Sequence, residues 1–138
     1  MKIMLHGATN GSNFGDFIFA DFFYKYLEHN NLDVYFYDGP LYGIGNYFKK
    51  NIPYCKKKSF FNVFECDLLV YLPGGYFGDS NSRLIDSLKR IIRYLSVGYI
   101  FMLRRKPICI IGVGGGPINN IILRFFLKKI INYSALVM

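Results

Sequence analysis

The sequence predicts an α/β protein with a doubly wound, Rossmann-like parallel sheet of about five strands. Short apolar runs alternate with longer segments whose apolar residues recur at helical spacing, which is typical of βαβ units. Three of these runs stop at glycine-rich loops, at residues 7–15, 73–79 and 112–117. The chain has 138 residues, of which 52% are hydrophobic, so we expect a single domain (1–138) with a substantial core.

The first half of the chain is predicted to contain two strands and one long helix. Residues 2–6 form the first apolar strand, and residues 33–37 form the second. Between them, apolar residues lie three and four positions apart from 16 to about 29, which predicts a helix. The periodicity is lost between 41 and 63, where we expect a long surface excursion with a short helix around 46–51.

The helix predicted at 16–29 is unusually rich in aromatic residues. Phe19, Phe22 and Tyr26 widen its apolar face, so we expect this helix to be covered nearly all round. Asp16 near its start interacts favourably with the positive end of the helix dipole.

The second half of the chain continues the alternation. Residues 68–72 are a continuous apolar run, as in a strand buried on both faces. A long helix is expected at 82–103, with a bend or an end at Gly98. A strand at 107–111 follows. The last helix starts at Asn119 or Asn120, either of which suits a cap, and runs to about residue 132, before a strand at 134–138.

The charge pattern narrows the classes of partner. Seventeen basic and nine acidic residues give a net charge of +8, and the basic residues fall in short clusters. This favours anionic partners, such as a membrane surface or a phosphate-bearing substrate, although solvated faces beside apolar segments would give the same pattern. No nucleic-acid-binding motif accompanies the charge, so nucleic acid is not an expected partner.

The cysteines and the apolar segments indicate a cytoplasmic protein. The three cysteines form no CxxC pair, and we expect neither a disulfide framework nor a metal site. The longest apolar stretch, 94–103, is about half of the roughly 20 residues needed to span a bilayer. Contact with the inner face of the cell membrane stays open.

The three glycine loops are the expected binding site, although glycines needed only for close packing of helix against strand would give the same pattern. The carboxyl ends of parallel strands share one edge of the sheet, where ligands bind, so the loops should lie side by side. None of them has a dinucleotide fingerprint or a Walker motif, and no cofactor is expected. The candidate substrate-binding residues are Asn13, Gly15, Asp16, Gly74, Gly75, Tyr76, Asp79, Gly114 and Gly115.

Two carboxylates and one histidine near this edge have alternative roles. Asp16 and Asp79 could bind sugar hydroxyls or accept a proton from one, and Asp16 is the candidate catalytic residue. Each could equally stabilise its own helix start or turn. His6 ends the first strand, where a structural role is favoured over donation to an anion.

Three ordered motifs resemble the polysaccharide pyruvyl transferase family. They are Asn13-Phe-Gly-Asp16, Leu72-Pro-Gly-Gly-Tyr-Phe-Gly-Asp79 and Gly112-Val-Gly-Gly-Gly-Pro117. The resemblance implies a glycosyltransferase-B-like enzyme with two Rossmann-like domains. It would move an enolpyruvyl group from phosphoenolpyruvate, its donor substrate, to a sugar of a bacterial capsule, exopolysaccharide or cell wall, forming a pyruvate ketal. The acceptor would be a saccharide or a lipid-linked glycan.

The resemblance also has departures. Tyr76 stands where the family often has a third glycine, and it would narrow the pocket or stack on a sugar ring. Family members are considerably longer, so we expect an N-terminal half that is inactive alone and that pairs with a missing C-terminal half or with a second copy. The alternatives are a non-catalytic binding module and half of a sugar-nucleotide glycosyltransferase.

Overall fold

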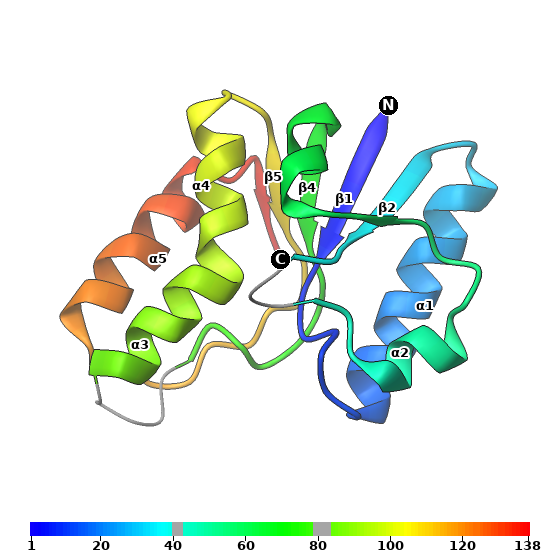
Figure 1. Ribbon diagram of the computed structural model, residues 1–138. Coiled ribbons are helices and arrows are strands. Elements are labelled where there is room, and N and C mark those ends of the chain that lie inside the picture. The colour runs from blue at the N-terminus through cyan, green and yellow to red at the C-terminus, as the bar shows by residue number, and fades with distance from the viewer. Residues whose placement is uncertain (40–42, 79–83) are drawn as a thin grey trace.

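The computed structural model describes the chain except for residues 40–42 and 79–83 and the side chains of Phe60 and Phe61 (Figure 1). Its described part contains one all-parallel sheet in the order β3-β2-β1-β4-β5-β6. The strands are β1 (Lys2–His6), β2 (Asp33–Tyr37), β3 (Lys57–Lys58), β4 (Leu68–Tyr71), β5 (Ile108–Ile110) and β6 (Leu136–Val137). The helices are α1 (Phe14–His29), α2 (Asn46–Asn51), the 3₁₀-helix η1 (Phe60–Glu65), α3 (Leu84–Arg90), the π-helix η2 (Ile91–Leu95), α4 (Ser96–Leu103) and α5 (Ile121–Tyr133).

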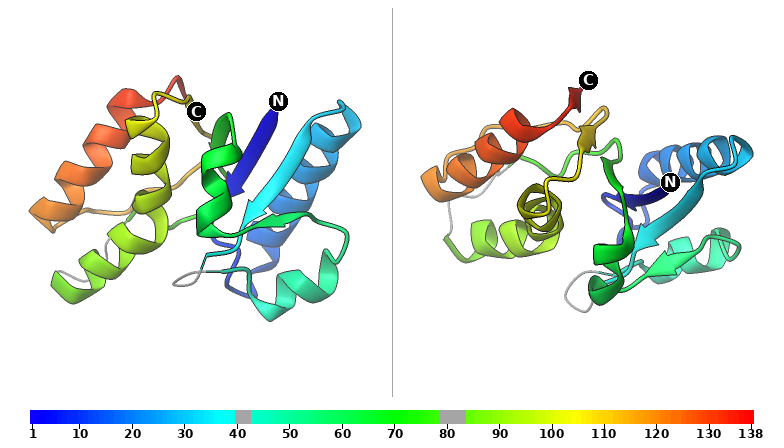
Figure 2. Two further views of the ribbon diagram at one scale, coloured as in Figure 1. Left: turned by 45° about the horizontal axis from the view of Figure 1, so that its top comes forward. Right: turned by 90° about the horizontal axis from the view of Figure 1, so that it is seen from above.

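The helices form two layers around the sheet. α1 and α2 cover one face, and α3, η2, α4 and α5 cover the other (Figures 1 and 2). Alternate residues of β1 point to the two layers: Ile3 and Leu5 pack with α1 and α2, whereas Met4 packs on the side of α4 and α5. The predicted doubly wound α/β fold is confirmed, with six strands in place of about five.

The additional strand is β3, in the region where we expected only a surface excursion and a short helix. It pairs with the end of β2, where Phe36 faces Lys57 and Tyr37 faces Lys58. Lys58 is buried and forms an ion pair with Glu65. A two-residue strand of lysines has no apolar pattern of its own, so its pairing with β2 determines it.

The prediction that α1 is covered nearly all round is wrong for its outer side. Phe19, Phe22 and Tyr26 are 48%, 58% and 58% exposed, whereas Ala20 and Tyr24 are buried against the sheet. One face of a helix can contact a flat sheet, and the exposed aromatic residues lie beside this face, where Phe19 and Phe22 line a hollow with Pro73 and Ile111. The helix also begins at Phe14, two residues earlier than predicted, because Asn13 caps it.

The long helix expected at 82–103 is interrupted by the π-helix η2, and the expected bend at Gly98 is wrong. Two side chains from strand ends bond to carbonyls of η2. The Tyr71 hydroxyl donates to the Tyr94 carbonyl at 2.6 Å, and His6 Nε2 lies 2.9 Å from the Arg93 carbonyl. Side chains inserted into a helical ladder are a known cause of such irregularities. Gly98 lies inside α4, where it packs against Tyr71.

The end of the chain agrees with the sequence prediction. Asn120 caps α5 by accepting hydrogen bonds from the backbone of Ile122 and Leu123, and β6 lies within the predicted last strand. Among the described residues, no helix has the length and apolar character required to cross a membrane.

Candidate functional site

The carboxyl ends of the strands lie at one edge of the sheet, at the bottom of Figure 1, and the second and third glycine loops join there. Gly74 forms a parallel bridge with Val113, and the Gly114 amide donates to the Gly74 carbonyl at 2.9 Å. A β-carbon added to Gly78 would lie 2.4 Å from the Gly116 nitrogen. The two loops therefore touch through their backbones, with no space for a side chain between them.

The start of α1 brings the first glycine loop to the same edge. The Asn13 side chain accepts a hydrogen bond from the Gly15 amide at 3.0 Å, and this cap orients the first helical turn. Asp16 Oδ1 would lie 3.2 Å from a β-carbon placed on Gly74. Residues that are 58 positions apart by number thus meet at one point, as the parallel topology predicts.

Asp16 is half-buried beside Gly74, and burial raises the pKa of its carboxyl while the hydrogen bond with Asn13 partly opposes the rise. A carboxylate with a raised pKa accepts a proton more readily. Gly74 has a φ of +155°, and a β-carbon there would also lie 3.1 Å from the Tyr76 ring. A side chain at position 74 would crowd the Asp16 carboxylate, and glycine avoids this contact.

At three of the predicted glycines, the backbone at the carboxyl edge of the sheet is accessible to a ligand. Gly75 and Gly115 have no other atoms within 4 Å of an added β-carbon, and Gly114 is exposed. Their backbone amides and carbonyls can be approached by a ligand, which is what a sugar or an anion requires. Asn13 and Gly15 are exposed as well.

Tyr76 and Asp79 differ from the other predicted residues. Tyr76 is 4% exposed, donates to the Leu72 carbonyl at 2.7 Å and stacks on Tyr94 with ring centroids 4.7 Å apart. The Tyr76 ring is part of the core beneath the loop. A buried ring cannot stack on a sugar, so of the two roles predicted for Tyr76 its position agrees with a narrower pocket. Asp79 lies outside the described residues.

His6 has the structural role that the sequence favoured. It is buried and packs edge-on against Tyr37 with centroids 4.9 Å apart. Burial lowers the pKa of His6 to about 4, so the imidazole is neutral near pH 7. Because its partner at Arg93 is a carbonyl, Nε2 carries the hydrogen. A neutral, enclosed histidine is unsuited to binding an external anion.

A basic pocket beside the second loop was missed in the site prediction. It has a volume of about 340 Å³ and is lined by Asp86, Lys89, Arg90, Arg93 and Tyr94. Arg90 Nη1 donates to the Tyr76 carbonyl at 3.5 Å, which places the pocket next to the loop. The sequence spacing of Lys89, Arg90 and Arg93 indicates that they share one helix face. It does not indicate which loop lies next to this face, so the pocket could not be predicted.

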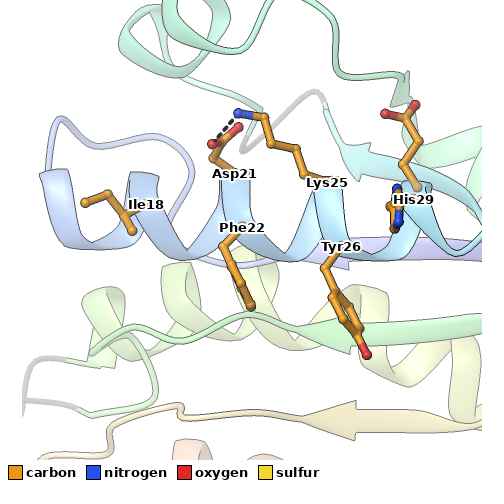
Figure 3. A pocket seen from close by; sticks show the side chains of 7 residues that line it. Ile18, Asp21, Phe22, Lys25, Tyr26 and His29 are labelled. Atoms are coloured by element: carbon orange, nitrogen blue, oxygen red, sulfur yellow. Dashed lines mark hydrogen bonds and ion pairs between the residues drawn. The ribbon is translucent and has the colours of Figure 1, made fainter.

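A second hollow, of about 770 Å³, lies along the outer side of α1 (Figure 3). Ile18, Phe22 and Tyr26 line it together with the ion pair of Lys25 and Asp21, whose atoms are 2.8 Å apart. None of the predicted substrate-binding residues that the structure describes lines it. It lies on the side of α1 away from the glycine loops, which are the candidate site.

A parallel sheet in this order, with glycine-rich loops at its carboxyl edge, defines a Rossmann-like domain, and ligands bind at this edge in such folds. The family model described as polysaccharide pyruvyl transferase matches residues 13–138, and the chain belongs to this family. The family indicates a transferase of polysaccharide biosynthesis. Comparisons with curated proteins and with solved structures gave no match.

Proposed function

We propose that this chain forms the acceptor side of an enzyme that transfers an enolpyruvyl group from phosphoenolpyruvate to a sugar of a bacterial surface polysaccharide. One sugar hydroxyl oxygen adds to the C2 atom of phosphoenolpyruvate while the methylene carbon takes up a proton. A second hydroxyl of the same sugar displaces inorganic phosphate and closes the pyruvate ketal. The two hydroxyl groups lose two protons in total. The methylene carbon takes up one proton when it becomes the methyl group, and the released phosphate takes up the other.

The observation that supports this proposal most is the position of Asp16 beside Gly74, at the edge where the glycine loops meet, in a chain that the family model matches over residues 13–138. In the proposal, Asp16 accepts the proton of the attacking hydroxyl, for which its raised pKa is suited. The open backbone at Gly75 and Gly115 binds the other hydroxyls of the sugar. Asn13 holds the first turn of α1, and so Asp16, in place.

We further propose that the chain requires a second β/α half to turn over. Phosphoenolpyruvate carries a phosphate and a carboxylate, which call for several cations around the reacting carbon. The candidate site residues in the described part of the three loops include one carboxylate and no cationic side chain, and the basic pocket beside the second loop holds only one of the donor's two anionic groups in the proposal. The reaction is proposed to occur at the cytoplasmic face of the membrane, on a saccharide or a lipid-linked glycan.

Saccharide binding tests the acceptor role directly. Saturation-transfer NMR with methyl glycosides of glucose, galactose, mannose and N-acetylglucosamine is expected to detect binding to the folded chain. Asp16→Asn should weaken it about fivefold, because a neutral acceptor forms a hydrogen bond weaker by about 1 kcal/mol. Asp21→Asn is the matched control, since Asp21 lies on the same helix but lines the outer hollow.

Two results would count against the proposal. Equal binding by the Asp16→Asn and Asp21→Asn variants would remove Asp16 from the acceptor site. Phosphate release from phosphoenolpyruvate and a glycan by the chain alone would refute the need for a second half.

A further inference from the structure

We infer that the basic pocket of Asp86, Lys89, Arg90, Arg93 and Tyr94 binds a phosphate group of a substrate. The pocket lies outside the three glycine loops and contains none of the residues assigned to the acceptor sugar. The inference rests on the proposed function only for the identity of the ligand, and not for the presence of the site.

The pocket is built on one face of a continuous helical segment. Asp86, Lys89, Arg90 and Arg93 are separated by three or four positions, so their side chains emerge from the same side of α3 and η2. Tyr94 is buried and stacks on Tyr76, which gives the pocket a rigid aromatic floor. The cationic groups are thus grouped by the backbone geometry of the helix.

The position of the pocket is fixed at the carboxyl edge of the sheet. The Arg90 guanidinium reaches the Tyr76 carbonyl, and the Arg93 carbonyl is bonded to His6 at the end of β1. Both contacts join the helix to segments that end at this edge. A phosphate in the pocket would therefore lie beside the loop that includes Gly74, next to the proposed sugar site.

The charge of the pocket matches a phosphate better than a carboxylate. Three cationic side chains and one carboxylate leave a net charge of +2, which a phosphate monoester or a diphosphate can neutralise. Guanidinium groups bind phosphate oxygens in pairs, and lysine adds a compact charge.

The size of the pocket admits such a group. Its volume of about 340 Å³ is many times the space that one water needs, and it is sufficient for a phosphate or a diphosphate. Two substrates of the proposed reaction could supply the phosphate. One is phosphoenolpyruvate, and the other is a lipid-linked acceptor with a diphosphate between sugar and lipid.

Calorimetric titration of the full chain with inorganic phosphate, inorganic pyrophosphate and phosphoenolpyruvate tests the inference at low salt, because screening weakens such contacts. The main variant is Lys89→Gln with Arg93→Gln, which retains the Arg90 contact with the Tyr76 loop. It is expected to weaken binding at least tenfold. The control is Lys57→Gln with Lys128→Gln, which removes the same charge from exposed lysines of β3 and α5 and should change binding less than twofold.

The outcomes separate the sources of the phosphate. Tighter binding of phosphoenolpyruvate than of inorganic phosphate assigns the pocket to the donor, and tighter binding of pyrophosphate assigns it to a diphosphate acceptor. If the double variant does not fold, as judged by circular dichroism, Lys89→Glu reverses one exposed charge and is expected to weaken binding at least fivefold.

The inference fails if no ligand binds saturably, or if the pocket variants and the control lose the same affinity. Its failure is distinguishable from that of the proposed function. Asp16→Asn should leave pyrophosphate binding unchanged, so loss of sugar binding alone would refute the acceptor role and leave the phosphate pocket standing.

Discussion

The contact between the second and third glycine loops predicts a large difference between two glycine-to-alanine variants. In Gly78→Ala the new β-carbon would lie 2.4 Å from the Gly116 nitrogen and 2.9 Å from its Cα. Ordinary contacts need about 3.5 Å, so the two backbones must separate by about 1 Å. Overpacking of this kind costs about 1–3 kcal/mol, and loss of the hydrogen bond from the Gly114 amide to the Gly74 carbonyl adds about 1 kcal/mol.

Gly115→Ala is the matched control in the third loop. An added β-carbon there meets no atom within 4 Å, so the variant should be neutral, or more stable by about 0.4–1 kcal/mol through the unfolded state. Gly78→Ala should therefore lose about 2–4 kcal/mol of unfolding free energy relative to the wild type, or about 6–12 °C in melting temperature.

Urea unfolding followed by far-ultraviolet circular dichroism measures both variants, since the chain contains no tryptophan to report fluorescence. Equal stability of Gly78→Ala and Gly115→Ala would refute the contact between the loops. It would then also remove the physical basis for a single binding edge.

Gly98 and His6 test the core between the sheet and the layer of α3, α4 and α5. Gly98→Ala should cost about 1–3 kcal/mol although alanine favours helix, because the new β-carbon would lie 2.5 Å from the Tyr71 hydroxyl. Tyr71→Phe should recover part of this loss in the double variant, and strictly additive thermal shifts would contradict the contact. For His6, burial lowers the folded-state pKa from 6.5 to about 4, so the unfolded chain binds a proton first as pH falls. The unfolding free energy should then drop by about 2.4 kcal/mol between pH 7 and about 4.5. Urea midpoints at these two pH values measure it, and the same drop in His6→Gln would refute the assignment.

The features of the fold that the sequence predicts are those encoded locally. The apolar runs at β1, β4 and β5 are bounded by turn residues, and each adopts the predicted strand. The cap at Asn120 is likewise a local signal, because its side chain bonds to the next turn of its own helix. Such features need no knowledge of what packs against them.

The features that the sequence does not predict depend on distant partners. β3 is a strand because its two lysines meet the end of β2, and η2 is irregular because Tyr71 and His6 bond to its carbonyls. The outer face of α1 has the same apolar periodicity as its inner face, so periodicity cannot tell which side meets the sheet.

The candidate site divides in the same way. The grouping of Asp16, Gly74 and Gly114 follows from parallel topology, which the alternation of strands and helices predicts. The burial of Tyr76 does not, because it depends on Tyr94, which the π-helix turns toward the loop. Tyr76 in place of a glycine indicates that the pocket differs in shape. The position of the Tyr94 ring determines where the Tyr76 side chain lies.

The irregular helix and the proposed phosphate pocket have a common origin at the strand ends. His6 ends β1 and Tyr71 ends β4, and their bonds to the carbonyls of Arg93 and Tyr94 anchor η2 over the carboxyl edge. A regular helix would satisfy these carbonyls internally and would leave its rotation to apolar packing alone. Anchoring through these two hydrogen bonds instead fixes which face of α3 and η2 adjoins the loop, and that face includes Arg90 and Lys89. The position of the cations beside the proposed sugar site is thus set by Tyr71 and by His6, which burial keeps neutral.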